Sequence, residues 1–174
     1  MKASPCDSSR CKIAVEGKLP RSIGIDKRFV ALAAREFAGK AARLAGESFK
    51  EVVIVLQDDE FSSVTHKAIN GVDGATDVTT QRYDAMPGEE PGVYGELYVN
   101  AERALCACNR RRGWSPAKEL LLYIAHGMDH LAGSDDQTES DYLRMRRREL
   151  LWLRSVLRKS ALLIHSRKNQ RAGS

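Results

Sequence analysis

The segment SPAKELLLYIAHGMDHLAG, residues 115–133, has the pattern of a helix that lies at the centre of a domain. Ser115 is a suitable N-cap, Pro116 takes the first helical position, and Glu119 falls in the first turn. Gly133 is expected to end the helix. Its apolar residues lie on nearly every side, which predicts a buried helix. They are Leu121, Leu122, Ile124, Ala125 and Met128.

The segments around this helix alternate between strand and helix patterns. Strand patterns occupy KIAVEG (12–17), EVVIVL (51–56), TDVTTQRY (76–83) and VYGELYV (93–99). The continuous apolar run 51–56 is typical of a strand that is buried on both faces. Helix patterns occupy 26–45, 59–69, 100–112 and a last stretch that begins near 138 and passes 157. The alternation predicts an α/β (α+β) fold, a small mixed β-sheet with helices packed on it and the helix at 115–133 central.

The length of 174 residues suits a single domain with one core. We expect this domain at 12–158, after an N-terminal extension at 1–11 and before a basic, partly disordered tail at 159–174. The sequence contains no run of about 18 apolar residues that would predict a membrane span. Its first residues lack the apolar core of a signal peptide. We therefore expect a cytoplasmic protein.

Positive charge is in excess, with a formal net charge of +5 and a sequence pI of about 9.1. Arginines form two runs, 110–112 and 146–148. Such runs favour an anionic partner such as RNA. The alternative is that they belong to solvated helix faces, because many modestly basic domains bind nothing charged.

Two histidines and an aspartate have the spacing of a metal site. His126 and His130 lie four residues apart, so both imidazoles fall on one face of the helix. Gly133 can turn the chain back sharply, and Asp136 could then return to the same ion. The string predicts a three-ligand divalent metal site with open positions. The competing interpretation is that the histidines cap a buried helix and the aspartates start the next one.

A zinc peptidase is disfavoured by a single position in this string. Zinc proteases of the H-E-x-x-H type place a general-base glutamate directly after the first histidine. Gly127, which has no side chain, stands there.

Three segments resemble the signature of a known family, the YbeY endoribonucleases. HGMDHLAGSDD (126–136) is similar to the family's H-G-x-L-H-L-x-G-Y-D-H. NGVDGATDVTT (70–80) is similar to its R-G-x-D-x-P-T-D-V-L-S, and YGELYVNAERA (94–104) to its L-G-D-I-x-I-S-x-x-x-A. The resemblance implies a metal-dependent, single-strand-specific endoribonuclease that acts in 16S ribosomal RNA maturation and ribosome quality control. It also implies ribosomal RNA, the ribosome and its assembly factors as partners.

The chain departs from the family's pattern at positions that matter for chemistry. Asp136 stands where the family has a third histidine ligand, and Asn70 where it has an arginine near the scissile phosphate. Carboxylate oxygen is an ordinary zinc ligand, so zinc stays the expected ion, although the carboxylate makes manganese more competitive. Asn70 cannot offer the positive fork of arginine to a phosphate. Lys67 and Arg82 flank the same motif and are candidates to replace it.

Asp129 stands where the family has leucine and is a further catalytic candidate. Its carboxylate could orient an imidazole or act as a general base. It could equally point to the surface and pair with a cation. The sequence leaves these roles open.

A second function, from a different class, is compatible with the same residues. The protein could be a ribosome-assembly factor that binds RNA and carries a structural or weakly active metal site. The oligomeric state and the role of the four cysteines are left open.

Overall fold

The structure is a computed structural model that describes residues 11–108 and 113–171, with side chains through residue 159. The N-terminal extension, except for Cys11, and the arginine run at 110–112 therefore lie outside the described residues. The elements follow in the order β1 (Lys12–Gly17), the 3-10 helix η2 (Arg21–Ile23), α1 (Lys27–Ala45), β2 (Phe49–Gln57), α2 (Asp59–Asn70), β3 (Val78–Asp84), β4 (Val93–Asn100), α3 (Ala101–Ala107), α4 (Pro116–Leu131) and α5 (Glu139–Arg171).

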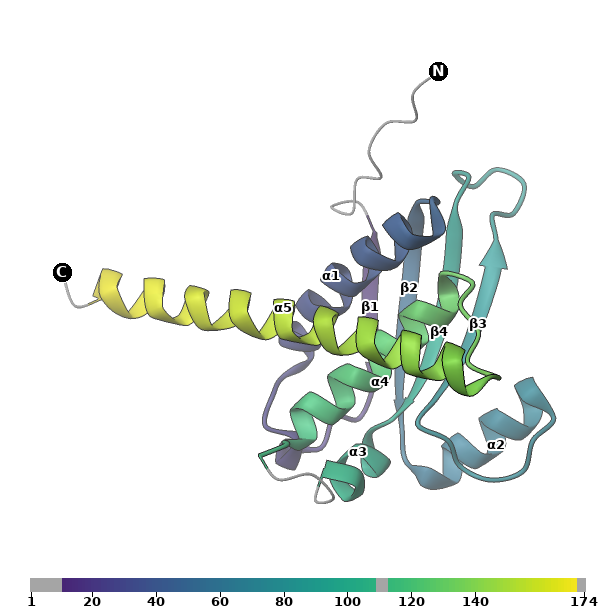
Figure 1. Cartoon of the computed structure of the whole chain (residues 1–174), viewed down its shortest axis with the longest axis horizontal. Coiled ribbons are helices and arrows are strands. Elements are labelled where there is room, and N and C mark those ends of the chain that lie inside the picture. The colour runs from purple at the N-terminus through teal and green to yellow at the C-terminus, as the bar shows by residue number, and fades with distance from the viewer. Residues whose placement is uncertain (1–10, 109–112, 172–174) are drawn as a thin grey trace.

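The four strands form one mixed sheet in the order β1-β2-β4-β3. The pairs β1–β2 and β2–β4 are parallel, whereas β3 and β4 are antiparallel neighbours joined by the turn that contains Pro87 and Gly88. Helices α1 and α4 pack on one face of the sheet, α5 lies over α4 and α1, and α2 lies beside β3 and β4 (Figure 1). The predicted α/β class is confirmed.

Strand β2 was predicted to be buried on both faces, but only one of its faces is fully buried. Val52, Ile54 and Leu56 are buried, whereas Val53 and Val55 on the opposite face are half-buried. The continuous apolar run marks the central position of β2 between two parallel neighbours. It does not imply equal cover on both faces, because α1, α4 and α5 pack on the same side.

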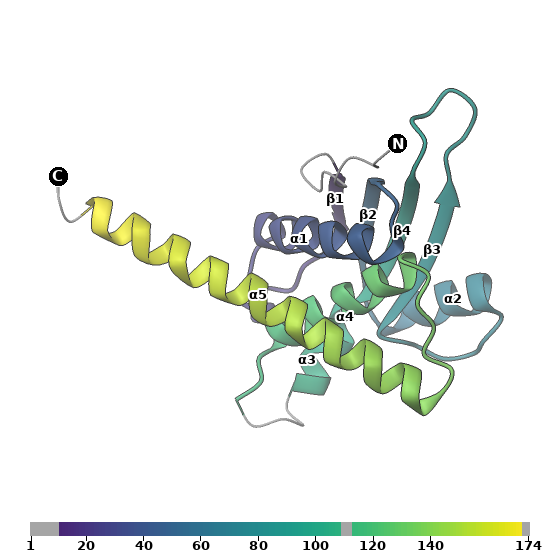
Figure 2. The ribbon, with the colours of Figure 1, turned by 45° about the horizontal axis from the view of Figure 1, so that its top comes forward.

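Helix α4 lies against the sheet and beneath α5, in contact with α1, α3, α5, β3 and β4 (Figure 2). Two glycines permit this close packing. A Cβ atom on Gly95 of β4 would lie 2.6 Å from Leu131 Cδ1, and one on Gly127 of α4 would lie 2.8 Å from Leu97 Cδ2. The absence of a side chain at Gly127 therefore has a packing role, because it allows α4 to approach β4 closely.

Helix α5 crosses over α4 and extends away from the rest of the domain (Figure 1). It remains helical to Arg171, through most of the stretch that was expected to form a partly disordered tail. The division of the chain into extension, domain and tail stays a prediction. None of the helices in the described part of the chain is both long enough and apolar enough to cross a membrane.

Candidate metal centre

The two histidines occupy the last two turns of α4. The helix begins as the sequence predicts, with the Ser115 side chain accepting from the Lys118 backbone N–H and Pro116 in the first turn. It ends at Leu131, and Gly133 follows with φ of 87°, a left-handed conformation that suits glycine. The reversal at Gly133 sends the chain back towards the helix.

The returning loop brings Asp136 to the two imidazoles. His126 Nε2 lies 3.2 Å from His130 Nε2 and 3.5 Å from Asp136 Oδ2. His130 Nε2 lies 3.8 Å from Asp136 Oδ1. Ligand atoms of these three residues all lie within 4.8 Å of one another, and no other such cluster occurs in the described residues. The structure thus brings together the three residues predicted as metal ligands.

The outer nitrogens of both histidines are already committed to acceptors. His126 Nδ1 lies 2.7 Å from Glu149 Oε1, and His130 Nδ1 lies 3.0 Å from the Ser134 carbonyl oxygen. A carboxylate and a carbonyl can only accept, so each Nδ1 must carry a hydrogen and donate it. In the neutral imidazoles both Nε2 atoms therefore present lone pairs to each other. Such an arrangement requires a cation or a proton between them.

The spacing of the donor atoms fits a tetrahedral metal ion. Two ligands at zinc bond lengths of about 2.1 Å, separated by a tetrahedral angle, lie roughly 3.4 Å apart. The separation of 3.2 Å between the two Nε2 atoms and that of 3.5 Å between His126 Nε2 and Asp136 Oδ2 lie close to that value. Glu149 and Ser134 also provide the contacts by which outer groups fix the tautomer and orientation of metal-binding histidines.

Electrostatics at His126 favour positive charge in this centre. Burial disfavours the protonated ring, but the hydrogen bond and charge of Glu149, with Asp77 and Asp136, outweigh it and raise the pKa of His126 above 6.5. Glu149 is 1 % exposed. The local sequence gives no sign of this contact, because Glu149 lies in another helix.

Asp129 pairs with a cation, as one of its sequence-based interpretations expected, but the pair is buried and not on the surface. The carboxylate is fully buried and accepts two hydrogen bonds from Arg148 of α5. Arg148 also donates to the Ser134 hydroxyl at 2.8 Å. This geometry favours a positioning role over proton transfer, because Arg148 already occupies both carboxylate oxygens. Asp135 shapes the same loop by accepting from the backbone N–H groups of Asp136 and Gln137.

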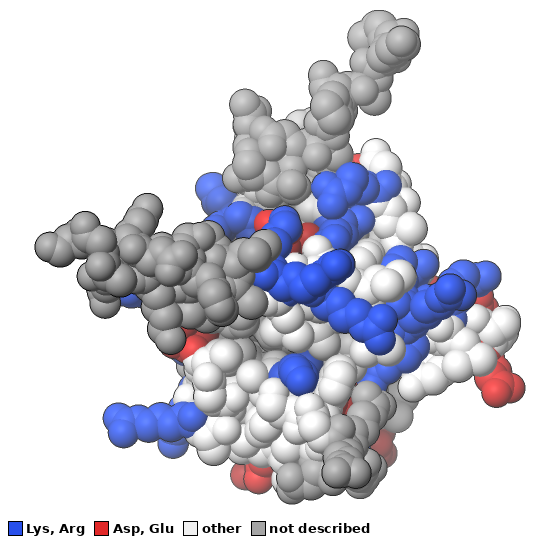
Figure 3. Space-filling view, turned by 60° about the vertical axis from the view of Figure 1, so that its left-hand side comes forward, with Lys and Arg blue, Asp and Glu red and all other residues white. Residues whose placement is uncertain are grey.

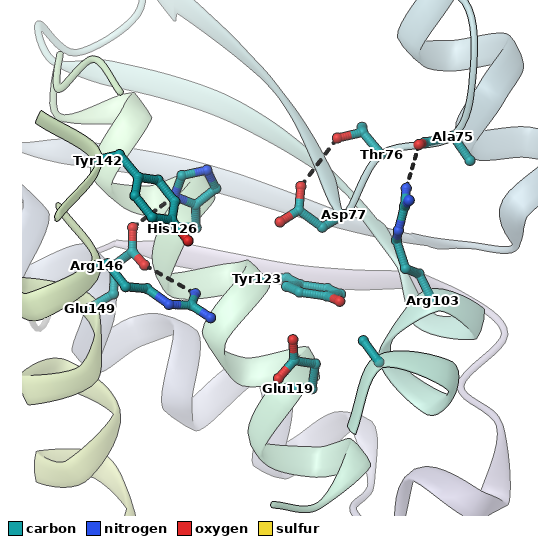
Figure 4. A pocket seen from close by; sticks show the side chains of 11 residues that line it. Ala75, Thr76, Asp77, Arg103, Glu119, Tyr123, His126, Tyr142, Arg146 and Glu149 are labelled. Carbon is teal, nitrogen blue, oxygen red and sulfur yellow. Dashed lines mark hydrogen bonds and ion pairs between the residues drawn. The ribbon is translucent and has the colours of Figure 1, made fainter. Parts of the chain in front are cut away.

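A polar pocket of about 460 Å³ opens beside His126 (Figure 4). It lies between α3, α4, α5 and the segment that precedes β3. Two arginines line it together with His126: Arg146, from the run at 146–148 that favours an anionic partner, and Arg103, which sequence reasoning did not select. The other lining residues are Ala75, Thr76, Asp77, Ala107, Glu119, Tyr123, Tyr142 and Glu149.

Asn70 and its proposed substitutes lie outside the lining of this pocket. Asn70 is the exposed last residue of α2. Lys67 pairs with Asp73 at 2.7 Å on the surface. Arg82 donates to the Leu131 carbonyl oxygen at 2.8 Å and forms two hydrogen bonds to Glu47. Arg82 therefore stabilises the end of α4, and neither cation replaces the family arginine at this pocket.

Comparison of the sequence with known proteins identifies one family, in agreement with the arrangement of the site. A family model described as Endoribonuclease YbeY matches residues 22–156. Endoribonuclease YbeY of Rhodopirellula baltica is 32% identical over 117 residues, which are 67% of this chain and 59% of that protein. The match to Endoribonuclease YbeY of an Anaeromyxobacter species spans 57% of that protein. For Endoribonuclease YbeY of Chloroflexus aurantiacus, 31% identity extends over 78% of this chain and 90% of the relative.

A solved structure supports the fold independently of these sequence matches. The solution structure of TM1509 from Thermotoga maritima superposes with a TM-score of 0.53 and covers 86% of this chain and 93% of its own, at 18% identity. The first two relatives named above are matched over less than two thirds of their length. The family model, however, covers most of the described domain. By this match, the chain belongs to the endoribonuclease YbeY family.

Proposed function

We propose that this protein is a metal-dependent endoribonuclease that cleaves single-stranded RNA, with His126, His130 and Asp136 holding one divalent ion. The observation that carries the proposal is the pair of imidazole Nε2 atoms 3.2 Å apart, next to a carboxylate and with both Nδ1 atoms committed elsewhere. Zinc is the proposed ion, because two imidazoles and one carboxylate form an ordinary zinc ligand set. When bound, the ion would polarise a phosphodiester oxygen and acidify a water molecule.

The chain's own residues prepare the centre for this chemistry. Glu149 and the Ser134 carbonyl hold the two imidazoles with Nε2 directed inwards. Asp136 contributes a negative charge that a third histidine would lack. The bound ion is consequently a weaker Lewis acid than in relatives with three histidines, and manganese competes better for the site. Asp129 acts through Arg148 by fixing the loop at Ser134.

Family membership extends the proposal to the cell. The substrate would be ribosomal RNA, and the activity would serve 16S maturation and ribosome quality control. The ribosome and its assembly factors would be partners in the cytoplasm. The relatives' names support the endoribonuclease activity and RNA as substrate.

A second function is favoured by one observation, the surface position of Asn70 in place of an arginine. If no other cation stabilises the transition state, the protein would bind ribosomal RNA during ribosome assembly and cleave it slowly or not at all. The metal centre would then hold α4, the returning loop and α5 together.

The decisive experiment compares metal-loaded and chelator-treated protein on a single-stranded fragment of ribosomal RNA, with the same strand in a duplex as control. The proposal expects cleavage of the single strand, loss of cleavage after chelation, and recovery when zinc or manganese is added back. His126→Ala should lack both metal and activity. Cleavage that does not need metal would reject the metal dependence. No cleavage by protein with a full complement of metal would reject the nuclease activity.

A further inference from the structure

The pocket beside His126 carries two arginines among its lining residues, together with three carboxylates. Its volume of about 460 Å³ is within the usual range of roughly 300–1,000 Å³ for small-molecule sites. It shares His126 with the metal centre, so an RNA strand that reaches the ion passes the mouth of the pocket. Two guanidinium groups line it, from α3 and from α5.

Arg146 reaches from α5 into the pocket and is only loosely held there (Figure 4). Within the part of the chain described, its recorded ion pair is a contact of 3.5 Å between Nη1 and Glu149 Oε2. Glu149 Oε2 is buried and has no hydrogen-bond partner among the described residues. The long contact leaves the guanidinium fork of Arg146 available for a bidentate interaction with phosphate oxygens.

Arg103 is fixed in place on the opposite side of the pocket. Its backbone N–H donates to the N-cap side chain of Asn100 at 2.8 Å, at the start of α3. Its Nη1 donates to the carbonyl oxygen of Ala75, in the segment that leads into Asp77 and β3. A guanidinium anchored by one nitrogen keeps its other N–H groups for a ligand.

Each carboxylate of the pocket accepts at least one hydrogen bond from the protein, although Glu149 Oε2 has no hydrogen-bond partner among the described residues. Glu119 accepts from the Trp114 indole N–H, and Asp77 accepts from the Val78 backbone N–H and the Thr76 hydroxyl. Glu149 accepts from His126. With His126 in its neutral form, these donors are neutral groups and leave the carboxylates charged, so an anion can be attracted here only by the two arginines of the lining.

We propose that Arg103 and Arg146 bind a phosphate of the RNA strand next to the metal centre and supply the positive charge that Asn70 cannot. The inference rests on the proposed function for its ligand, a phosphodiester of single-stranded RNA. Binding of a phosphate by these two arginines differs from nonspecific attraction of RNA to exposed Lys and Arg side chains. Figure 3 shows Lys and Arg side chains as a band across one face of the molecule, and such a band could hold RNA without any pocket.

Consecutive residues of α5 provide a matched test. Arg146 lines the pocket, whereas Arg147 is exposed and does not. Arg146→Gln and Arg147→Gln remove the same charge one residue apart on the same helix. The probe is a labelled single-stranded oligoribonucleotide, bound to chelator-treated protein so that no cleavage occurs. Dissociation constants are measured over a range of salt concentrations.

We expect Arg146→Gln to weaken binding about tenfold, a loss of about 1.4 kcal/mol, because a charge-assisted hydrogen bond to the phosphate is removed. The slope of log affinity against log salt should become shallower by about 0.7, the value for one phosphate contact on a single strand. Arg103→Gln should weaken RNA binding to a similar extent. Because Arg103 lies on α3, this variant tests the pocket even if Arg146→Gln folds poorly. Arg147→Gln should change affinity by less than about twofold.

A merely structural role for Arg146 would act through Glu149 and His126 and would lower metal content instead of RNA affinity. Arg146→Lys separates the two roles: lysine keeps the charge beside Glu149 but lacks the fork, so metal content should be normal and RNA affinity only partly restored. Equal losses in Arg146→Gln and Arg147→Gln would overturn the subsite in favour of the general basic surface. Unchanged affinity in both pocket variants, or no RNA binding by the chelated wild type, would also overturn it.

These outcomes are separable from failure of the nuclease proposal. Binding is measured without metal, whereas cleavage by the wild type needs metal. A protein that binds RNA through Arg146 but never cleaves would refute only the nuclease. A protein that cleaves, yet binds equally well without either arginine, would refute only the subsite.

Discussion

Arg148 of α5 holds the buried carboxylate of Asp129 in α4 by two hydrogen bonds, Nε to Oδ2 at 2.7 Å and Nη2 to Oδ1 at 2.6 Å. The same Nη2 donates to the Ser134 hydroxyl, and the Ser134 carbonyl accepts from His130 Nδ1. A contact between two helices is thereby connected to the orientation of a metal ligand. The family signature that the sequence resembles has leucine at position 129 and tyrosine at position 134, so this polar connection is not part of that signature.

Removing one member of this pair should destabilise the fold. Asp129→Ala leaves the Arg148 guanidinium without its partner. Breaking a buried pair costs about 3–5 kcal/mol, and the lower end applies because the Arg148 side chain is 23% exposed. The double variant Asp129→Leu with Arg148→Leu replaces both charges by apolar groups and should recover most of the loss. Urea denaturation measures both. A double variant as unstable as the single one would contradict this explanation.

Glu149 should control metal affinity through His126. Glu149→Gln keeps an acceptor for the His126 Nδ1–H but removes the charge. We expect metal affinity to fall roughly tenfold, at the lower end of the effects of outer contacts on metal-binding histidines. Competition with a chromophoric chelator measures the change. Glu60→Gln, at an exposed position in α2, is the control. Equal affinity in the two variants would show that Glu149 does not tune the centre.

The raised pKa of His126 predicts opposite pH trends for metal-free and metal-loaded protein. In the metal-free protein the folded state binds the proton more tightly than the unfolded chain, whose histidine titrates near 6.5. This contribution to stability is fully present below 6.5 and is lost as pH rises through the raised pKa. With metal the trend reverses, because the ion competes with that proton and gains affinity as pH rises.

Thermal melts of both forms across this window test the prediction. The melting temperature of the metal-free wild type, relative to metal-free His126→Gln, should fall as pH rises above 6.5. The shift produced by adding metal to the wild type should grow over the same range. Parallel trends in the two forms would mean that His126 does not carry the relevant proton.

Asp136→His should raise activity at neutral pH. The substitution removes a negative charge beside the ion, so a metal-bound water should become more acidic. The rising limb of the pH–rate profile should move to lower pH. Metal content must be measured first, because the loop after Gly133 now positions a carboxylate 3.5 Å from His126 Nε2. A variant that keeps its metal and leaves the rising limb in place would show that Asp136 has another role, such as positioning the attacking water.

The sequence by itself determined the parts of this protein that depend on neighbours along the chain. Helical periodicity placed His126 and His130 on one face, and Gly133 allowed the reversal that brings Asp136 back. All three proposed ligands fall within one helix end and its loop, so local geometry suffices to bring them together. The alternation of elements and the buried pattern of α4 likewise followed from local residues.

Only the tertiary structure decided what surrounds those ligands. The three arginines at 146–148 look alike in sequence, yet one lines the pocket, one is exposed and one binds Asp129. Successive residues of a helix point about 100° apart, so each faces a different environment, and which environment that is depends on how α5 packs across α4. Glu149 reaches the site for the same reason, whereas Arg103 reaches it through the packing of α3 on α4. Asn70, which the motif aligns with an arginine of the family signature, ends α2 on the surface. The motif gives the position of this residue in the chain, but the packing of the elements decides what it contacts.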